Sequence, residues 1–139
     1  MASKPRIAVY PGTFDPITLG HLDVLKRGSR LFDRVILAVA PSDSKNPWFS
    51  LEERLSMARE ATKKMGNIEV AVLEGLTVEF AEKHQAIAII RGLRKFSDFE
   101  FEFDRDSKFE NTCIYACSFA VTHDTCKHAS TYGHSRTCF

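Results

Sequence analysis

The chain of 139 residues has the length of one domain, and its 44% hydrophobic and 27% charged residues are ordinary for a soluble globular protein. Nineteen Lys and Arg against 18 Asp and Glu give a formal net charge of +1, which argues against a nucleic-acid-binding protein with a broad basic surface. No apolar run approaches the ~18 residues of a membrane-spanning helix, and the N-terminus lacks a signal-peptide core. We therefore expect a cytoplasmic protein that does not bind membranes.

The first elements of the chain alternate between a buried strand and an amphipathic helix. Residues 6–10 form a short apolar run that Pro11-Gly12 is expected to close with a tight turn. A helix is predicted from Gly20 to Phe32, because its leucines recur on one face. Residues 35–40 are apolar throughout, which is typical of a strand covered on both sides.

The same alternation continues in the middle of the chain. Ser50 and Glu53 stand three residues apart, the spacing of a capping box, so we expect a helix to begin there and to stop at Gly66. The next expected elements are a strand at 68–73, a helix at 78–84 and a strand at 86–90.

This order predicts an α/β fold of the Rossmann-like type, with a parallel sheet and helices on both faces. In such sheets the ligand lies beyond the carboxyl ends of the strands. The rule selects three loops, at 11–20, 41–49 and 91–97. In the first loop, Thr13 and His21 lie near a helix start, where backbone amides and the helix dipole favour an anion.

Three strings of the sequence lie in or beside these loops. They are Gly12-Thr13-Phe14-Asp15-Pro16 with Thr18-Leu19-Gly20-His21; Ser44-Lys45-x-Pro47 with Phe49-Ser50-Leu51-Glu52-Glu53-Arg54; and Ile90-Arg91-Gly92-Leu93-Arg94 with Asp98-Phe99-Glu100-Phe101-Glu102. From about Arg6 to Phe103 the sequence resembles the phosphopantetheine adenylyltransferases, a branch of the nucleotidyltransferase superfamily. Most other branches carry histidine where this chain has Thr18.

The resemblance implies an enzyme that transfers AMP from ATP to 4′-phosphopantetheine, giving dephospho-coenzyme A and pyrophosphate. The attacking phosphate has its second pKa near 6 and is mostly dianionic at neutral pH, so the reaction needs no general base. What the site must supply is positive charge and hydrogen-bond donors for an in-line transition state. By resemblance His21 is the catalytic residue, which stabilises the transition state through the α-phosphate.

The resemblance also assigns binding residues and partners. ATP-binding residues are expected to be Thr13, Phe14, His21, Gly92, Leu93, Arg94 and Glu102, and substrate-binding residues Thr13, Lys45, Thr77 and Arg91. Mg²⁺ is expected to bridge the ATP phosphates without a set of protein ligands. The family assembles as hexamers, so we expect a homo-oligomer.

The tail at 104–139 departs from the family pattern, so we interpret the chain as a single domain at 1–139 with a family-like core at 6–103. It lacks the family's Ile-Ser-Ser-Ser motif for ATP phosphates, and from about Thr122 onward it has too few apolar residues to predict an ordered segment. Its four cysteines are spaced like no common zinc module and are interpreted as free thiols. An altered reading frame and genuine divergence both fit this tail. A second function stays open for this reason: a catalytically impaired relative that keeps the substrate-binding loops.

Overall fold

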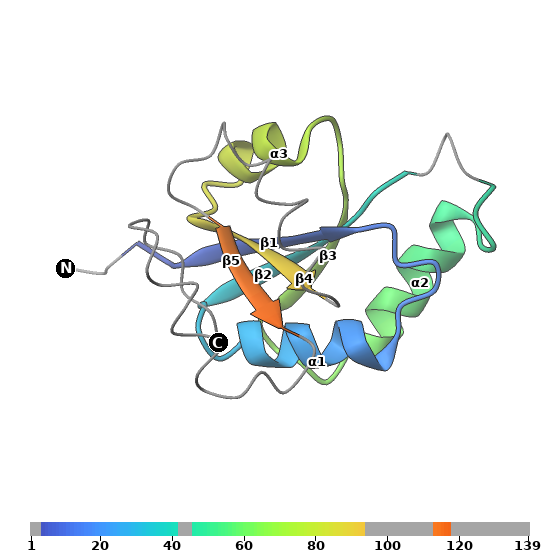
Figure 1. The fold of residues 1–139 in the computed structure, drawn as a ribbon, viewed down its shortest axis with the longest axis horizontal. Helices are drawn as coiled ribbons and strands as arrows, with labels where there is room; N and C mark the ends of the chain where they lie inside the picture. The colour runs from blue at the N-terminus through green and yellow to red at the C-terminus, as the bar shows by residue number, and fades with distance from the viewer. Residues whose placement is uncertain (1–3, 42–45, 94–112, 118–139) are drawn as a thin grey trace.

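The protein contains a parallel sheet at its centre. The computed structural model describes residues 4–41, 46–93 and 113–117, and these form five strands and three helices (Figure 1). The elements are β1 (Ile7–Gly12), α1 (Leu19–Gly28), β2 (Arg34–Val39), α2 (Leu51–Thr62), β3 (Ile68–Val72), α3 (Thr77–Lys83), β4 (Ala88–Leu93) and β5 (Cys113–Cys117). The strand order is β3-β2-β1-β4-β5, and every paired strand is parallel. The predicted α/β fold is confirmed.

The helices cover both faces of the sheet, as predicted. In Figure 1, α1 and α2 lie below the sheet and α3 lies above it. Successive residues of a strand point to opposite faces, and the core is divided accordingly. Ala8 and Tyr10 of β1 belong to the apolar cluster under α1 and α2, whereas Ile7 and Val9 belong to the cluster under α3.

Strand β1 continues through the Pro11-Gly12 pair, which we had expected to close it. Pro11 pairs in register with Ala38 and Gly12 with Val39, and the Gly12 carbonyl accepts a hydrogen bond from the amide of Ala40. The backbone hydrogen-bonding groups of Gly12 therefore point to β2, and by alternation those of Pro11 point to β4. The pairing of β1 with β4 ends at Val9, so the missing N–H of Pro11 falls where no ladder needs it.

Two helices are shorter than predicted. Helix α1 ends at Gly28 rather than Phe32, because the amides of Arg30 and Leu31 bond three residues back and tighten the end into a turn. Phe32 still fills the core from the turn, at 6% exposure. Helix α2 ends at Thr62 rather than Gly66, because the amides of Lys63 and Met65 bond three residues back and tighten the end into a turn.

Strand β5 was not predicted. It pairs with β4 from Ile89–Cys113 to Leu93–Cys117 and forms one edge of the described sheet. Its sequence Cys-Ile-Tyr-Ala-Cys is apolar throughout, and this was the available signal. The free-thiol interpretation concerns cysteine side chains that the structure does not describe. The expected disorder beyond Thr122 concerns a segment that also lies outside the described residues.

The sheet divides between β1 and β4 toward the carboxyl ends of the strands. The two strands are paired at Ala8–Ala88 and Val9–Ile89. Beyond these pairs β1 continues with β2 as far as Gly12, and β4 continues with β5 as far as Leu93. The opening lies where the connections change direction in the strand order, which is the usual ligand position in open α/β sheets.

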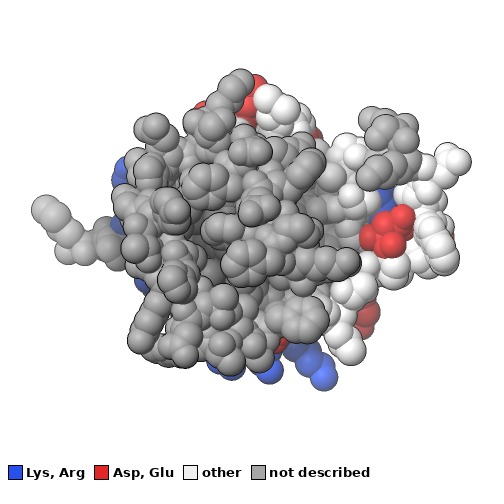
Figure 2. All heavy atoms as spheres, in the orientation of Figure 1, with Lys and Arg blue, Asp and Glu red and all other residues white. Residues whose placement is uncertain are grey.

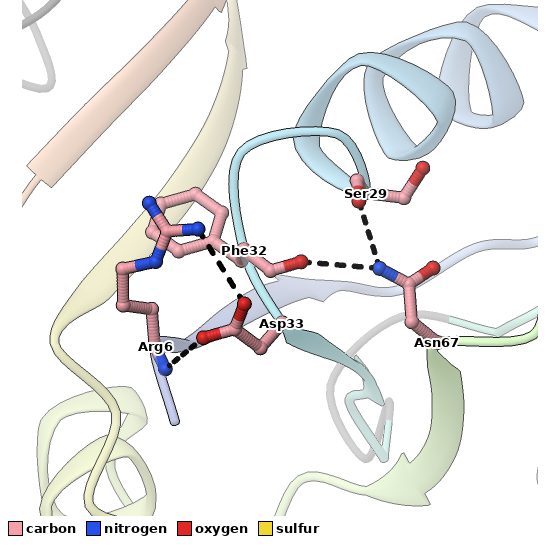
Figure 3. A network of polar contacts seen from close by, with 5 residues as sticks. All are labelled: Arg6, Ser29, Phe32, Asp33 and Asn67. Atoms are coloured by element: carbon pink, nitrogen blue, oxygen red, sulfur yellow. Dashed lines mark hydrogen bonds and ion pairs between the residues drawn. The ribbon is translucent and has the colours of Figure 1, made fainter. Parts of the chain in front are cut away.

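Polar contacts join the segments that precede the strands, at the amino-terminal end of the sheet (Figure 3). The Asn67 side chain, just before β3, donates to the carbonyls of Ser29 at 2.8 Å and Phe32 at 3.1 Å. The Asp33 carboxylate accepts from the Arg6 amide at 2.7 Å, and these contacts with Arg6 lower the pKa of Asp33. The starts of the first three strands are therefore tied to the α1–β2 turn.

The described surface carries both signs of charge. On the face drawn in Figure 2, the described basic and acidic side chains form separate small groups near the rim of the molecule. Among the described residues, no helix has the length and apolar character that a membrane span requires.

The capping box predicted for α2 is confirmed and leads to a pH-dependent expectation. The Glu53 carboxylate accepts from the amide and the hydroxyl of Ser50, at 2.8 and 2.9 Å, and these bonds lower the pKa of Glu53. A lowered pKa in the folded protein adds stability above the ordinary glutamate pKa, and this stability is lost as the pH falls through the lowered value. Glu53→Gln should therefore have a lower urea midpoint than wild type at pH 7, and the difference between the two midpoints should shrink as the pH falls through the lowered pKa.

The neighbouring Glu52 provides the control for this measurement. It lies in the same helical turn, but the hydrogen bonds to Ser50 are made by Glu53. Glu52→Gln should change the midpoint less than Glu53→Gln does at pH 7. A Glu53→Gln deficit of the same size at pH 3 and pH 7 would contradict the assigned cause.

Candidate functional site

His21 is fixed at the start of α1 by a capping box with Thr18. The backbone amide of Thr18 donates to His21 Nδ1 at 3.0 Å, and the Thr18 hydroxyl oxygen lies 3.1 Å from the same nitrogen. The amide of His21 donates back to the Thr18 hydroxyl. Because Nδ1 accepts the amide proton, the neutral ring carries its own proton on Nε2. The cap therefore selects the tautomer in which Nε2 is the hydrogen-bond donor.

The start of α1 is electrostatically suited to an anion. Its first turn contains no acidic residue, whereas the first turn of α2 contains Glu52 and Glu53. The positive end of the α2 dipole is thus already compensated by its own side chains, and that of α1 is not. Backbone amides and the helix dipole favour an anion at such a helix start, and binding of a phosphate group there with His21 stays a prediction.

Two aromatic rings support the His21 imidazole. The Phe14 ring lies 5.0 Å from it, edge to face, and the Tyr10 ring lies 6.5 Å away. Tyr10 and Phe14 also contact each other at 5.3 Å. Phe14 is 4% exposed and has a φ of 48°, an uncommon value for a residue other than glycine. Its ring therefore acts as a support under His21, and its contact with ATP stays a prediction.

Gly12 is needed for a different reason from the predicted tight turn. It lies in β1 and is not among the residues with positive φ. A Cβ at this position would lie 2.8 Å from Phe14 Cζ and 3.0 Å from Cε2. Glycine here lets the Phe14 ring lie directly against the strand, in contact with His21.

Two residues that hold the loops together were missed by the sequence analysis. The Asp15 carboxylate accepts from the backbone amides of Trp48 and Phe49, at 2.7 and 2.9 Å. The guanidinium of Arg54 donates to backbone carbonyls in both loops. A signal for Arg54 did exist, because it falls on the buried stripe of α2 with Leu55 and Ala58.

The end of β4 contributes residues to both faces of the sheet. Ile90 belongs to the cluster under α1 and α2. By alternation Arg91 points to the α3 face and Gly92 to the α1 face. A Cβ on Gly92 would lie 3.4 Å from the Tyr10 hydroxyl oxygen, so this part of β4 adjoins the aromatic support of His21.

Four of the described residues, two predicted for ATP and two for the acceptor, fall on different faces of the sheet. Thr77 is the first residue of α3, on the face to which Arg91 points, whereas His21 and Gly92 lie on the α1 face. Thr13 is exposed in the loop after β1. Leu93 ends β4, and the predictions for Lys45, Arg94 and Glu102 fall outside the described residues.

Comparison with known proteins identifies the family of the chain and its relatives. The family model described as cytidylyltransferase-like matches residues 9–133. A curated phosphopantetheine adenylyltransferase of Methylococcus capsulatus is 60% identical over 96 residues, which are 69% of this chain and 59% of that protein. That of Caldanaerobacter subterraneus is 53% identical over 98 residues, 70% of this chain and 61% of that protein. The resemblance found in the motifs is thereby confirmed, and the chain spans about three fifths of these relatives' length.

Solved structures support the same fold at lower identity. The nicotinic acid mononucleotide adenylyltransferase of Plasmodium falciparum has a TM-score of 0.66 and 18% identity, and covers 97% of this chain and 75% of its own. A putative nicotinate-nucleotide adenylyltransferase of Vibrio parahaemolyticus has a TM-score of 0.60 and 20% identity, with 88% and 78% covered. These likenesses concern the fold. From the family model that matches most of its length, the chain belongs to the cytidylyltransferase-like family.

Proposed function

We propose that this protein transfers AMP from ATP to 4′-phosphopantetheine, giving dephospho-coenzyme A and pyrophosphate. The observation that carries the proposal is the 53–60% identity to curated phosphopantetheine adenylyltransferases over a continuous stretch of 94–98 residues. The capped His21, at a helix start whose first turn contains no acidic residue, agrees with it, because a phosphoryl-transfer site needs donors aimed at phosphate oxygens.

In the proposed reaction a phosphate oxygen of 4′-phosphopantetheine attacks the α-phosphorus of ATP. A new P–O bond forms, the bond to the bridging oxygen of the β-phosphate breaks, and pyrophosphate leaves with that electron pair. The Nε2–H of His21 donates to an α-phosphate oxygen as charge builds up there. Thr13 holds the attacking phosphate, and Arg91 and Thr77 bind the acceptor from the α3 face.

The proposal includes a metal, an assembly and a location. Mg²⁺ would arrive with ATP and neutralise its phosphates. We propose that this ion is held mainly by the nucleotide. By resemblance we further propose a homohexamer that acts in the cytoplasm.

Product analysis tests the proposal directly. The purified chain would be incubated with ATP, Mg²⁺ and 4′-phosphopantetheine, and dephospho-coenzyme A would be detected by mass spectrometry alongside pyrophosphate release. Nicotinic acid mononucleotide serves as the control acceptor, because two fold neighbours carry nicotinate-nucleotide names. Turnover with 4′-phosphopantetheine alone is expected. Turnover with the control acceptor instead, or substrate binding without product, would overturn the proposal.

The division between the two faces predicts a selective effect of Arg91→Ala. This side chain belongs to the acceptor side, so its loss should weaken binding of 4′-phosphopantetheine by about 1.5–3 kcal/mol, the contribution of one charge-assisted hydrogen bond. The affinity for ATP should change much less. Isothermal titration calorimetry with each ligand measures both, and Arg30→Ala, an exposed residue beyond the end of α1, is the control. An equal loss of affinity for both ligands would contradict the assignment of Arg91 to the acceptor side.

A further inference from the structure

Arg54 is a buried cation whose hydrogen bonds all go to loop or strand-end backbone. It is 2% exposed. Its Nη1 donates to the carbonyls of Thr13 and Ala40, each at 2.8 Å, and its Nε donates to the carbonyl of Phe49 at 3.1 Å. One planar guanidinium therefore contacts the loop after β1 and both ends of the connection between β2 and α2.

Asp15 reinforces this contact from the opposite direction. It lies two residues after Thr13, and its carboxylate accepts from the amides of Trp48 and Phe49. Phe49 is thus bonded on its carbonyl side to Arg54 and on its amide side to Asp15. The loop after β1 and the β2–α2 connection are held together by two side chains of opposite charge.

Stability alone is a weak reason for this arrangement. Among the described residues no carboxylate lies within ion-pair distance of Arg54, and its hydrogen-bond partners there are backbone carbonyls. Burying a charge in this way is costly, and an apolar side chain would pack on the same stripe of α2 beside Leu55 and Ala58. The distinctive property of the guanidinium is its rigid fork, which fixes three carbonyls relative to one another.

We propose that Arg54 is a positioning residue for the acceptor phosphate. The inference rests on the proposed function, in which Thr13 holds the attacking phosphate. By fixing the Thr13 carbonyl against Ala40 and Phe49, Arg54 sets the loop after β1 relative to the two described ends of the β2–α2 connection. Arg54 acts through these backbone groups and contacts no substrate.

The kinetic test compares Arg54→Lys with wild type. Lysine keeps the charge but has no fork, so it cannot hold three carbonyls in the same arrangement. A misplacement of about 1 Å can cost on the order of 100-fold in rate. We expect KM for 4′-phosphopantetheine to rise at least tenfold and kcat to fall, while KM for ATP changes less than threefold. Arg59→Met, an exposed arginine of the same helix, is the control and should leave all three constants unchanged.

A purely structural role predicts a different pattern. Loss of folded protein would lower the apparent kcat and leave both KM values as they are, and general loosening would raise both equally. Either result would overturn the proposal, as would a change below threefold in every constant. Asp15→Asn keeps Arg54 in place and weakens the same connection, so it should shift KM in the same acceptor-selective way.

A measurement without catalysis separates this inference from the proposed function. Hydrogen exchange at the Trp48 and Phe49 amides reports whether the connection is held, whatever the reaction is. Exchange should be at least tenfold faster in Arg54→Lys than in wild type and unchanged in Arg59→Met. Unchanged exchange in Arg54→Lys would refute the positioning role. An inactive wild type with the expected exchange pattern would refute only the proposed function.

Discussion

Replacing His21 by alanine is expected to lower kcat by about 10²–10³-fold, the effect of removing one preorganised donor from a transition-state oxygen. The reason is geometric, because the capping box with Thr18 fixes the ring and places its proton on Nε2. The fold should persist, since losing a capping contact costs about 1 kcal/mol. Steady-state kinetics and thermal unfolding of the same preparation measure the two effects.

His84 provides the control for the loss of an imidazole. It follows α3 and stacks on Phe80, with ring centroids 4.4 Å apart, on the opposite face of the sheet from α1. His84→Ala should lower stability and leave kcat near the wild-type value. A fall of less than threefold for His21→Ala would remove this residue from the mechanism.

The second large effect is expected for Gly12→Ala. The added methyl group would lie 2.8 Å from Phe14 Cζ, so the ring must move away from the strand. Since Phe14 is buried and contacts the His21 ring, that movement should both destabilise the protein by about 1–3 kcal/mol and displace the imidazole. We expect kcat to fall by at least about tenfold, in line with the cost of misplacing a catalytic group.

Gly66→Ala is the matched control for this substitution. It adds the same methyl group at a position where no atom lies within 4 Å. Urea unfolding should give Gly66→Ala a stability at or above that of wild type. Wild-type kcat in Gly12→Ala would show that the Phe14 ring does not determine where His21 lies.

Much of the fold could be predicted because its strands are short, continuous apolar runs. β2 was located to within about one residue by this pattern, and β3, whose apolar run is interrupted by Glu69, was located as closely. The helix ends were less well predicted, because Leu31-Phe32 continues an apolar pattern beyond Gly28, where the chain has already turned. Strand β5 was overlooked because its five apolar residues stand in a segment whose composition otherwise suggests no element.

The candidate site was predictable where a side chain is both chemically distinctive and close to a helix start. Thr13 and His21 satisfy both conditions, and the structure places them after β1 and at the third position of α1. The role of Arg54 could not be predicted in this way, because its partners Thr13 and Ala40 lie 41 and 14 residues away in the sequence and are backbone carbonyls. No residue type marks such partners in a sequence, so only the folded chain reveals the contact.

The division of the sheet between β1 and β4 makes the central joint a determinant of the reaction geometry. The strands β3-β2-β1 and β4-β5 form two arms of the sheet. The pairs Ala8–Ala88 and Val9–Ile89 join these arms. One arm leads to Thr13 and His21, and the other ends at Gly92 and Leu93. The angle between the arms depends on four small or branched apolar residues that never meet a substrate. Enlarging either alanine is therefore expected to change the distance between the ends of the two arms without altering a predicted site residue.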